Sequence, residues 1–184
     1  MKLSKIANCM IGPNANEKKK LNQDHEIYSV EDIQKDLSQY LELDEVLDDK
    51  STQSNESKFI LNNGDLVINL MTNIASVVSK NNQDRIMTQA LMKIEPNDQF
   101  DKWYLCYLLN ESNEIKRQEM KNMEGTVIKR LTARLVKNLD INAVNINEQK
   151  RIGDIYRHAL KEKYLLQHKA NLIFASALSI IEND

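Results

Sequence analysis

The residues in this chain that come nearest to a catalytic set are Asp101, Glu114 and Lys116. Nucleases built on an Asp followed by a Glu-x-Lys pair hold a divalent metal beside a phosphate, with the Glu and the Lys on one strand. Here Trp103 to Lys121 has a helical pattern instead, and Glu-x-Lys arises often by chance when 28% of residues are charged. We therefore expect no nuclease activity.

The sequence shows no complete set of residues for other catalytic reactions either. Methyl transfer from S-adenosylmethionine to adenine would need a glycine-rich loop and an Asn/Asp-Pro-Pro-aromatic motif, but the two prolines, Pro13 and Pro96, are far apart and the four glycines are scattered. The two cysteines and three histidines show no metal-ligand spacing. Serine and cysteine nucleophiles have no evident histidine partner in the sequence, although pairing in space stays open. The sequence predicts a binding protein, with no metal and no cofactor.

Basic and amide side chains gather at two places suited to nucleic acid. Arg, Asn and Gln can read base edges through paired hydrogen bonds, and Lys most often meets phosphate. One group lies in a polar loop after a predicted strand, and the other follows a Gly-Thr pair. The candidate DNA contacts are Lys80, Asn82, Arg85, Thr126, Lys129, Arg130 and Arg134. For each single position, a solvated surface residue is the ordinary alternative.

Charge is unevenly spread along the chain. The formal net charge is −2, yet acidic residues dominate from Asp24 to Glu56 and basic residues from Lys116 to Lys169. A basic half can serve a polyanion because the local field decides the attraction. The competing interpretation is a solvated helix face with interspersed glutamates.

A long helix is predicted to organise the C-terminal part of the chain. Either Asn145 or Asn147 can cap the helix start, and Glu148 follows Asn145 at capping-box spacing. No proline comes after, so we expect one helix from Asn147 to Glu182, on the order of 50 Å long. Steps of four and three residues predict an interface stripe, interrupted only by Lys163: Ile152, Tyr156, Ala159, Leu166, Ala170, Ile173, Ala177 and Ile180. Such a step is typical of a coiled-coil seam. The alternative is a last core helix, but ordinary globular helices have about 8–20 residues.

The remaining elements predict a mixed α/β (α+β) fold with a small twisted sheet and flanking helices. We expect one recognition domain over residues 1–145, followed by the helix of residues 146–184, and no internal repeat. Expected elements are a first strand or entry segment over Lys2–Ala7, a helix within Ile27–Leu47, strands over Leu66–Met71, Ala75–Ser79 and Ile86–Ile94, helices over Asp101–Leu109 and Ile115–Met123, and a short helix Ala133–Lys137 that Thr132 caps.

Composition is that of one soluble domain. The chain has 184 residues, 41% of them hydrophobic, which is enough for one core but short for two. No apolar run approaches the roughly 18 residues that span a bilayer. The N-terminus lacks the apolar stretch of a signal peptide. We expect a cytoplasmic protein that does not enter a membrane.

Three blocks of sequence resemble one family. Ile146, Glu148, Gln149, Lys150, Ile152 and Ile155 are similar to the start of the long conserved helix in the specificity subunit of type I restriction–modification enzymes. Gly64-Asp65-Leu66-Val67-Ile68 resembles the Gly-Asp-Ile-Val-Ile strand of its target recognition domains, and the segment from Gly125 to Leu139 resembles a third block. Many members have prolines in the turn before the helix, whereas this chain has Asn142 to Asn145.

The resemblance implies a half-length specificity subunit without catalysis of its own. A full subunit has two recognition domains and two helices, and this chain has one of each. The family's recognition domain reads half of a split site in double-stranded DNA. Its helices pair antiparallel and dock methyltransferase subunits, and a restriction subunit can join. The expected partners are these proteins, DNA, and a second copy or another half-subunit. The alternative function is a protein–protein adaptor or assembly modulator, because the acidic segment from Asp24 to Glu56 would repel phosphate.

Overall fold

The fold is that of a computed structural model, which describes residues 1–14, 25–39, 58–123 and 131–182. Three of the candidate DNA contacts, Thr126, Lys129 and Arg130, lie outside the described residues. So does most of the acidic segment from Asp24 to Glu56.

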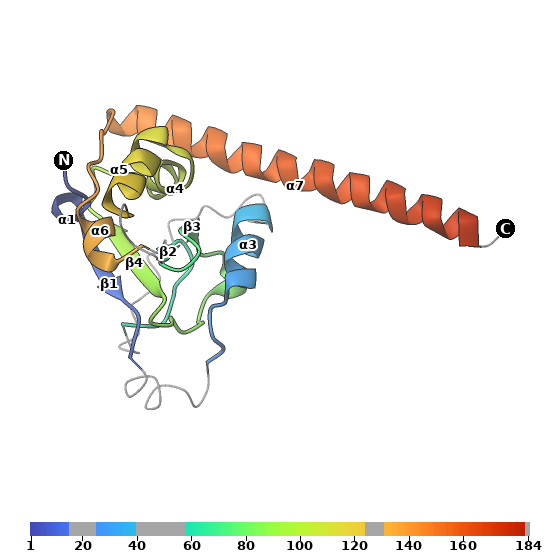
Figure 1. The fold of residues 1–184 in the computed structure, drawn as a ribbon, viewed down its shortest axis with the longest axis horizontal. Coiled ribbons are helices and arrows are strands. Elements are labelled where there is room, and N and C mark those ends of the chain that lie inside the picture. The colour runs from blue at the N-terminus through green and yellow to red at the C-terminus, as the bar shows by residue number, and fades with distance from the viewer. Residues whose placement is uncertain (15–24, 40–57, 124–130, 183–184) are drawn as a thin grey trace.

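A four-stranded antiparallel sheet forms the centre of the globular part (Figure 1). Its strands are β1 (Ala7–Ile11), β2 (Leu66–Asn69), β3 (Ile74–Val77) and β4 (Leu91–Pro96), in the order β1-β4-β2-β3. Ile94 of β4 pairs with Cys9 on one side and with Leu66 on the other. The tight connection from β2 to β3 brings the edge strand back beside β2. The two central strands, β4 and β2, were both predicted as strands, and β2 is buried along its whole length.

Two expected strands differ from the structure at their starts. Lys2–Ala7 is an entry segment: Leu3–Ile6 forms helix α1, and β1 begins only at Ala7. Leu3 and Ile6, three residues apart, are both buried, which suits one helical turn better than a strand. The third strand was predicted to begin at Ile86 but begins at Leu91, because Ile86 makes isolated bridges to Ile27 and Ile60 instead of joining the sheet.

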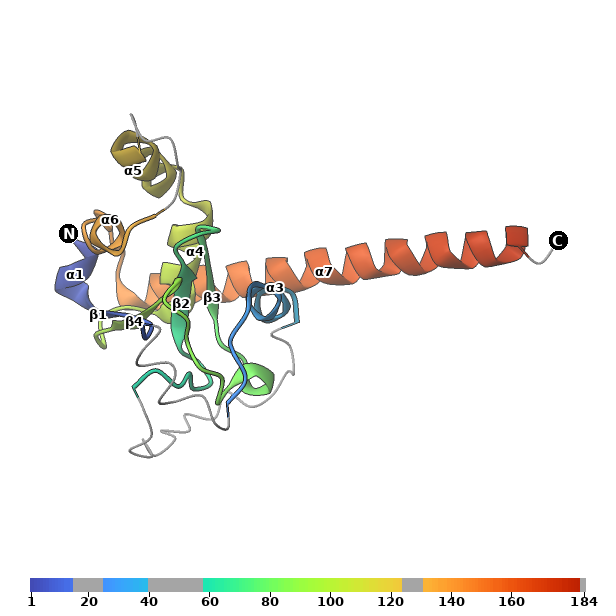
Figure 2. The ribbon, with the colours of Figure 1, turned by 60° about the horizontal axis from the view of Figure 1, so that its bottom comes forward.

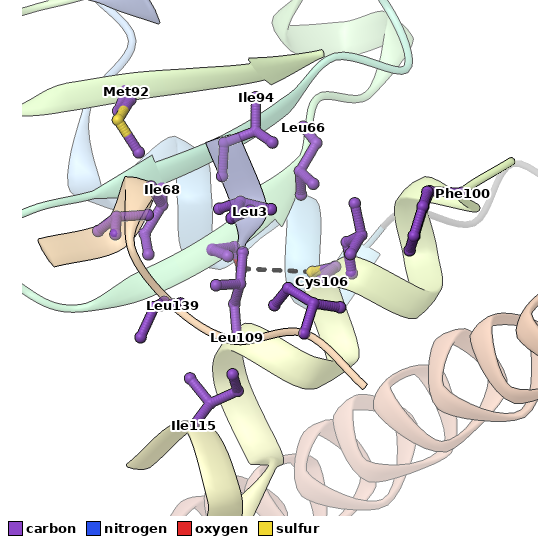
Figure 3. Close-up of a cluster of buried hydrophobic side chains, with 14 of the residues drawn as sticks. Leu3, Leu66, Ile68, Met92, Ile94, Phe100, Cys106, Leu109, Ile115 and Leu139 are labelled. Atoms are coloured by element: carbon purple, nitrogen blue, oxygen red, sulfur yellow. Dashed lines mark hydrogen bonds between the residues drawn. The ribbon is translucent and has the colours of Figure 1, made fainter. Parts of the chain in front are cut away.

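Each face of the sheet has its own apolar cluster, because side chains alternate along a strand. Ile68 and Ile94 point into the larger cluster, which α1, α4 (Lys102–Glu111) and α6 (Ala133–Lys137) cover (Figure 3). Val67 and Leu91 point to the opposite face, beneath helix α3 (Val30–Gln39). A 3-10 turn, η1 (Lys80–Asn82), follows β3 near α3.

The expected helices are confirmed, and so is the predicted Thr132 cap; the Asp101 cap was not predicted. Asp101 accepts a hydrogen bond from the Tyr104 N–H at the start of α4, and Thr132 accepts one from the Leu135 N–H at the start of α6. Residues beyond Glu111 form a separate helix, α5 (Asn113–Met123), rather than a continuation of α4.

Helix α7 (Ile146–Glu182) leaves the globular part and ends far from it (Figures 1 and 2). Its 37 residues span about 55 Å at 1.5 Å per residue. Asn145 caps it through a 3.0 Å hydrogen bond from the Glu148 N–H to Oδ1, as the sequence predicted. None of the helices in the described ranges is long and apolar enough to cross a membrane.

Candidate functional site

A buried glutamine joins the first turns of α7, which we call its root, to the domain through hydrogen bonds. The Gln149 side chain is 2% exposed. Its Oε1 accepts a hydrogen bond from the Asp101 N–H at 3.1 Å, and its Nε2 donates to the carbonyls of Gln99 (3.1 Å) and Val144 (2.8 Å). One side chain thus joins the first turn of α7 to the start of α4 and to the segment that enters α7.

The next two turns of α7 pack on α4 at very close range. A Cβ at Gly153 would lie 2.6 Å from Asp101 Oδ1 and 2.9 Å from Trp103 Cβ, so no larger residue fits without displacing one helix. One turn later the Tyr156 ring packs edge-on against Tyr107, with 5.6 Å between ring centroids. Gln149, Gly153 and Tyr156 therefore form one face that fixes the direction of α7.

Asn110 connects this helix contact to the edge of the sheet. Its Oδ1 accepts from the Ala75 N–H at 2.8 Å and its Nδ2 donates to the Ala75 carbonyl at 2.9 Å, so the amide pairs with β3 as another strand would. The same Nδ2 lies 3.2 Å from the Tyr156 hydroxyl. Burial is the main cause that raises the pKa of Tyr156 above its ordinary value, so this hydroxyl stays protonated.

The segment that leads into α7 is held from two sides. Gln118 on α5 pairs with both backbone groups of Asp140, at 3.0 and 2.8 Å. Lys2 forms a 2.7 Å ion pair with the Asp140 carboxylate, which lowers the pKa of Asp140, and Tyr104 donates to the Asn142 carbonyl at 2.9 Å. The start of α7 is therefore positioned by the N-terminus, α4 and α5 together.

Beyond its fifth turn, α7 is exposed and apolar. Of the predicted stripe, Tyr156 is buried and Ile152 half-buried, both against the domain. The rest of the stripe is exposed: Ala159, Leu166, Ala170, Ile173, Ala177 and Ile180. The sequence analysis missed a further set of exposed apolar residues on the same half of the helix: Leu165, Leu172, Phe174, Leu178 and Ile181. A helical-wheel count over residues 165–181 would have found them, because that stretch is apolar on all sides.

Asn82, in the loop that was predicted to contact DNA, is buried and hydrogen-bonded within the domain. Asn82 is 5% exposed, and its Nδ2 donates to Asp36 Oδ1 at 2.7 Å. The other oxygen of Asp36 accepts from the Tyr28 hydroxyl at 2.6 Å. Burial raises the pKa of Asp36 above its ordinary value, although these hydrogen bonds oppose the shift. Asn82 thus holds the 80–82 turn against α3, and its amide is occupied in this conformation.

The other candidate contacts that the structure describes do not form one patch. Arg85 forms ion pairs with Asp32 (2.7 Å) and Glu26 (3.1 Å). Lys80 is an exposed residue of η1 beside α3, whereas Arg134 is exposed on α6 beside α1. Figures 1 and 2 place α3 and α6 on opposite sides of the sheet. The structure therefore brings Lys80, Asn82 and Arg85 together and leaves Arg134 apart from them.

The residues of the nuclease pattern have structural partners. Asp101 caps α4, and Glu114 accepts two hydrogen bonds from Asn142. Glu114 and Lys116 lie on helix α5, not on a strand. Across the ranges that the structure describes, no group of three or more His, Cys, Asp or Glu side chains could hold a metal ion.

A family assignment follows from residues 2–173, which match the model of the type I restriction modification DNA specificity domain. The chain belongs to this family. Two solved structures share its fold. The HsdS subunit from Thermoanaerobacter tengcongensis aligns with a TM-score of 0.52 at 13% identity, over 92% of this chain and 38% of the subunit. A chain from a structure on complex assembly and conformational transition of the type I R-M system aligns with a TM-score of 0.59 at 13% identity, over 99% of this chain and 43% of that one.

This specificity-family chain thus spans about two fifths of the length of the two structural relatives. A comparison with curated proteins gave no match. The family assignment agrees with the resemblance that the sequence blocks carry, and the long helix from Ile146 lies largely inside the matched range.

Proposed function

We propose that this chain is a DNA-specificity subunit of half length, which reads one half of a bipartite site and positions methyltransferase subunits without catalysing a reaction itself. The family match over residues 2–173 carries the proposal. Residues 1–145 would form the recognition domain, and residues 146–184 the helix for dimerisation and methyltransferase docking. A restriction subunit would be a further partner.

The exposed half of α7 supports a protein partner. Leu166, Ile173 and Ile180 are each more than 60% exposed and lie on one stripe. Soluble monomers seldom leave an apolar patch of this size in water. A second copy of the chain can cover the stripe through a two-fold antiparallel pairing of the helices, which would restore the two-domain, two-helix layout of a full subunit.

This pairing has a direct test by sedimentation at micromolar concentration. Ile173→Asp would place a charge without a partner in the seam and should convert the dimer to a monomer. Ala175→Asp is the matched control, because Ala175 is exposed on the same helix but on the side opposite the stripe. A wild-type protein that is monomeric and binds no methyltransferase subunit would contradict the proposal.

DNA contact is proposed through Lys80, Arg85, Thr126, Lys129, Arg130 and Arg134. Asn82 can join this set only if its amide leaves Asp36, since the two are hydrogen-bonded. With a methyltransferase subunit present, the double variant Lys129→Ala, Arg134→Ala should weaken binding and lower the salt slope of log K by about 0.9 for each phosphate that is no longer neutralised. Lys35→Ala, an exposed lysine on α3, is the control.

The alternative function is a protein–protein adaptor or assembly modulator. The ion pairs of Arg85 and the buried amide of Asn82 favour it, because both side chains are used inside the domain. DNA binding that depends on salt but not on sequence, or no binding at all, would support the adaptor. Exchange of the whole domain for that of another member should change the methylated sequence if the chain is a specificity subunit.

A further inference from the structure

Helices α1, α5 and α6 carry an excess of positive charge. Together their sequences hold six basic residues and two acidic ones, whereas α3 holds three acidic residues and one basic residue. Within the part of the chain that the structure describes, five of the six cations have no ion pair or side-chain hydrogen bond. We call these five residues the outer basic surface: Lys5, Arg117, Lys121, Arg134 and Lys137.

Backbone contacts hold the three helices together around the segment that leads from α6 to α7. The Ile141 N–H donates to the Met1 carbonyl at 2.7 Å, so this segment lies along the N-terminus, just before α1. Gln118 on α5 bonds both backbone groups of Asp140 in the same segment. Both ribbon views show α1, α5 and α6 grouped at the end of the domain that lies away from the free end of α7 (Figures 1 and 2). The five cations therefore belong to one region of the surface.

The spacing of the cations keeps them on the outside of their helices. Arg117 and Lys121 are four residues apart on α5, and both are exposed. Arg134 and Lys137 are three residues apart on α6, which places them on one helix face as well. Lys5 is exposed because the two buried residues of α1 occupy the other side of its single turn.

Three acidic residues that border this surface are already engaged with other side chains. They are Asp140 with Lys2, Glu111 with Lys116, and Glu114 with Asn142. A carboxylate that is held by another group does little to cancel the charge of a neighbouring lysine or arginine. The outer basic surface therefore keeps its field for a bound polyanion.

The α3 side of the sheet has the reverse charge. Arg85 is paired there with Asp32 and Glu26, and the Asn82 amide is held by Asp36. A phosphate that approached this side would meet carboxylates beside cations that are already paired. Coulomb repulsion therefore opposes a polyanion at α3.

We infer that the outer basic surface holds the sugar–phosphate backbone of double-stranded DNA, and that the α3 side does not. The inference rests on the proposed DNA function and narrows its contacts to one side of the sheet. Protein–DNA interfaces are more polar and much more positive than protein–protein interfaces. On the described side chains of the three helices, Met120 is the one large apolar residue that is exposed. Contacts to phosphate position a protein on the duplex without reading its sequence, so this surface supplies affinity.

Salt titration of DNA binding by the full chain, alone and with a methyltransferase subunit, tests this assignment. The probe is a fluorescent duplex of about 30 base pairs with arbitrary sequence, and anisotropy gives its affinity from about 50 to 200 mM NaCl. Arg117→Gln with Lys121→Gln should lower the salt slope of log K by up to about 1.8, at about 0.9 for each phosphate that is no longer neutralised. Lys5→Gln with Lys137→Gln should do the same from the other two helices.

The matched control removes the same charge from the opposite side. Lys35→Gln with Lys80→Gln substitutes two exposed lysines on and beside α3, and it should leave the slope unchanged. Duplexes of different sequence add a second readout. The pairs on the outer basic surface should weaken binding to all of them by the same factor, because phosphate contacts carry no sequence information.

The outcomes separate this inference from the proposed function. A slope that falls in the control pair, and not in the two pairs on the outer basic surface, overturns the inference and leaves the DNA role in place. A wild type that shows no salt-dependent binding in either form overturns that role as well. Polyglutamate serves as a second probe. If the outer pairs weaken binding to polyglutamate but not to the duplex, the surface serves an acidic protein and the inference falls.

Discussion

Gln149 offers the sharpest test of how α7 is attached. Gln149→Ala removes three hydrogen bonds at once. The Asp101 N–H then has no acceptor, and it is shielded from water because Gln149 itself is only 2% exposed. A buried polar group left unpaired costs about 1–3 kcal/mol, and the Gln99 and Val144 carbonyls lose a donor as well. We expect a loss of about 2–4 kcal/mol in the free energy of unfolding, with faster hydrogen exchange in the first turns of α7.

Gln167→Ala is the matched control, because the same side chain is deleted from the same helix five turns farther along. Gln167 is exposed, so its loss should change stability by no more than about 0.5 kcal/mol. Both variants are to be compared in the Ile173→Asp background, where the tip stays free of a partner chain. Urea unfolding gives the free energies. Equal effects of the two deletions, or unchanged exchange at the root in Gln149→Ala, would refute the claim that this amide fastens α7.

Three further changes probe the domain by urea unfolding. Gly153→Ala should cost about 1–3 kcal/mol through overpacking against Asp101, and a neutral effect would contradict the close approach of the helices. Asn110→Ala should cost about 2–4 kcal/mol because both backbone groups of Ala75 lose their partner; a loss under about 1 kcal/mol would speak against the strand-like pairing. The raised pKa of Asp36 makes its neutral form the stabilising one, so this contribution is complete below the ordinary aspartate value and is lost as pH rises through the folded pKa. The stability of the wild type relative to Asp36→Asn should therefore fall as the pH rises above the ordinary aspartate pKa of about 4, and a difference that does not change with pH would refute a raised pKa for Asp36.

The sequence by itself determined the elements whose signals are local. The capping side chain of Asn145 and the absence of proline set the start and length of α7, since both act within a few residues of the helix. Thr132 and Asp101 cap their helices for the same reason. The apolar run from Leu66 indicated the central strand because it is short, follows the turn at Gly64 and contains the β-branched residues Val67 and Ile68.

Only the tertiary structure decided what each face of these elements meets. Asn82 looked like a residue for base contact, yet it is buried against Asp36, whose position forty-six residues earlier gives no local signal. Nothing local in the sequence shows why position 153 is a glycine, and the reason is visible only in the 2.6 Å approach of a Cβ there to Asp101. Helical periodicity defines rows of residues but not which row faces the domain. That choice depends on contacts between distant segments, such as the hydrogen bonds that join Gln149 to Asp101 and Gln99.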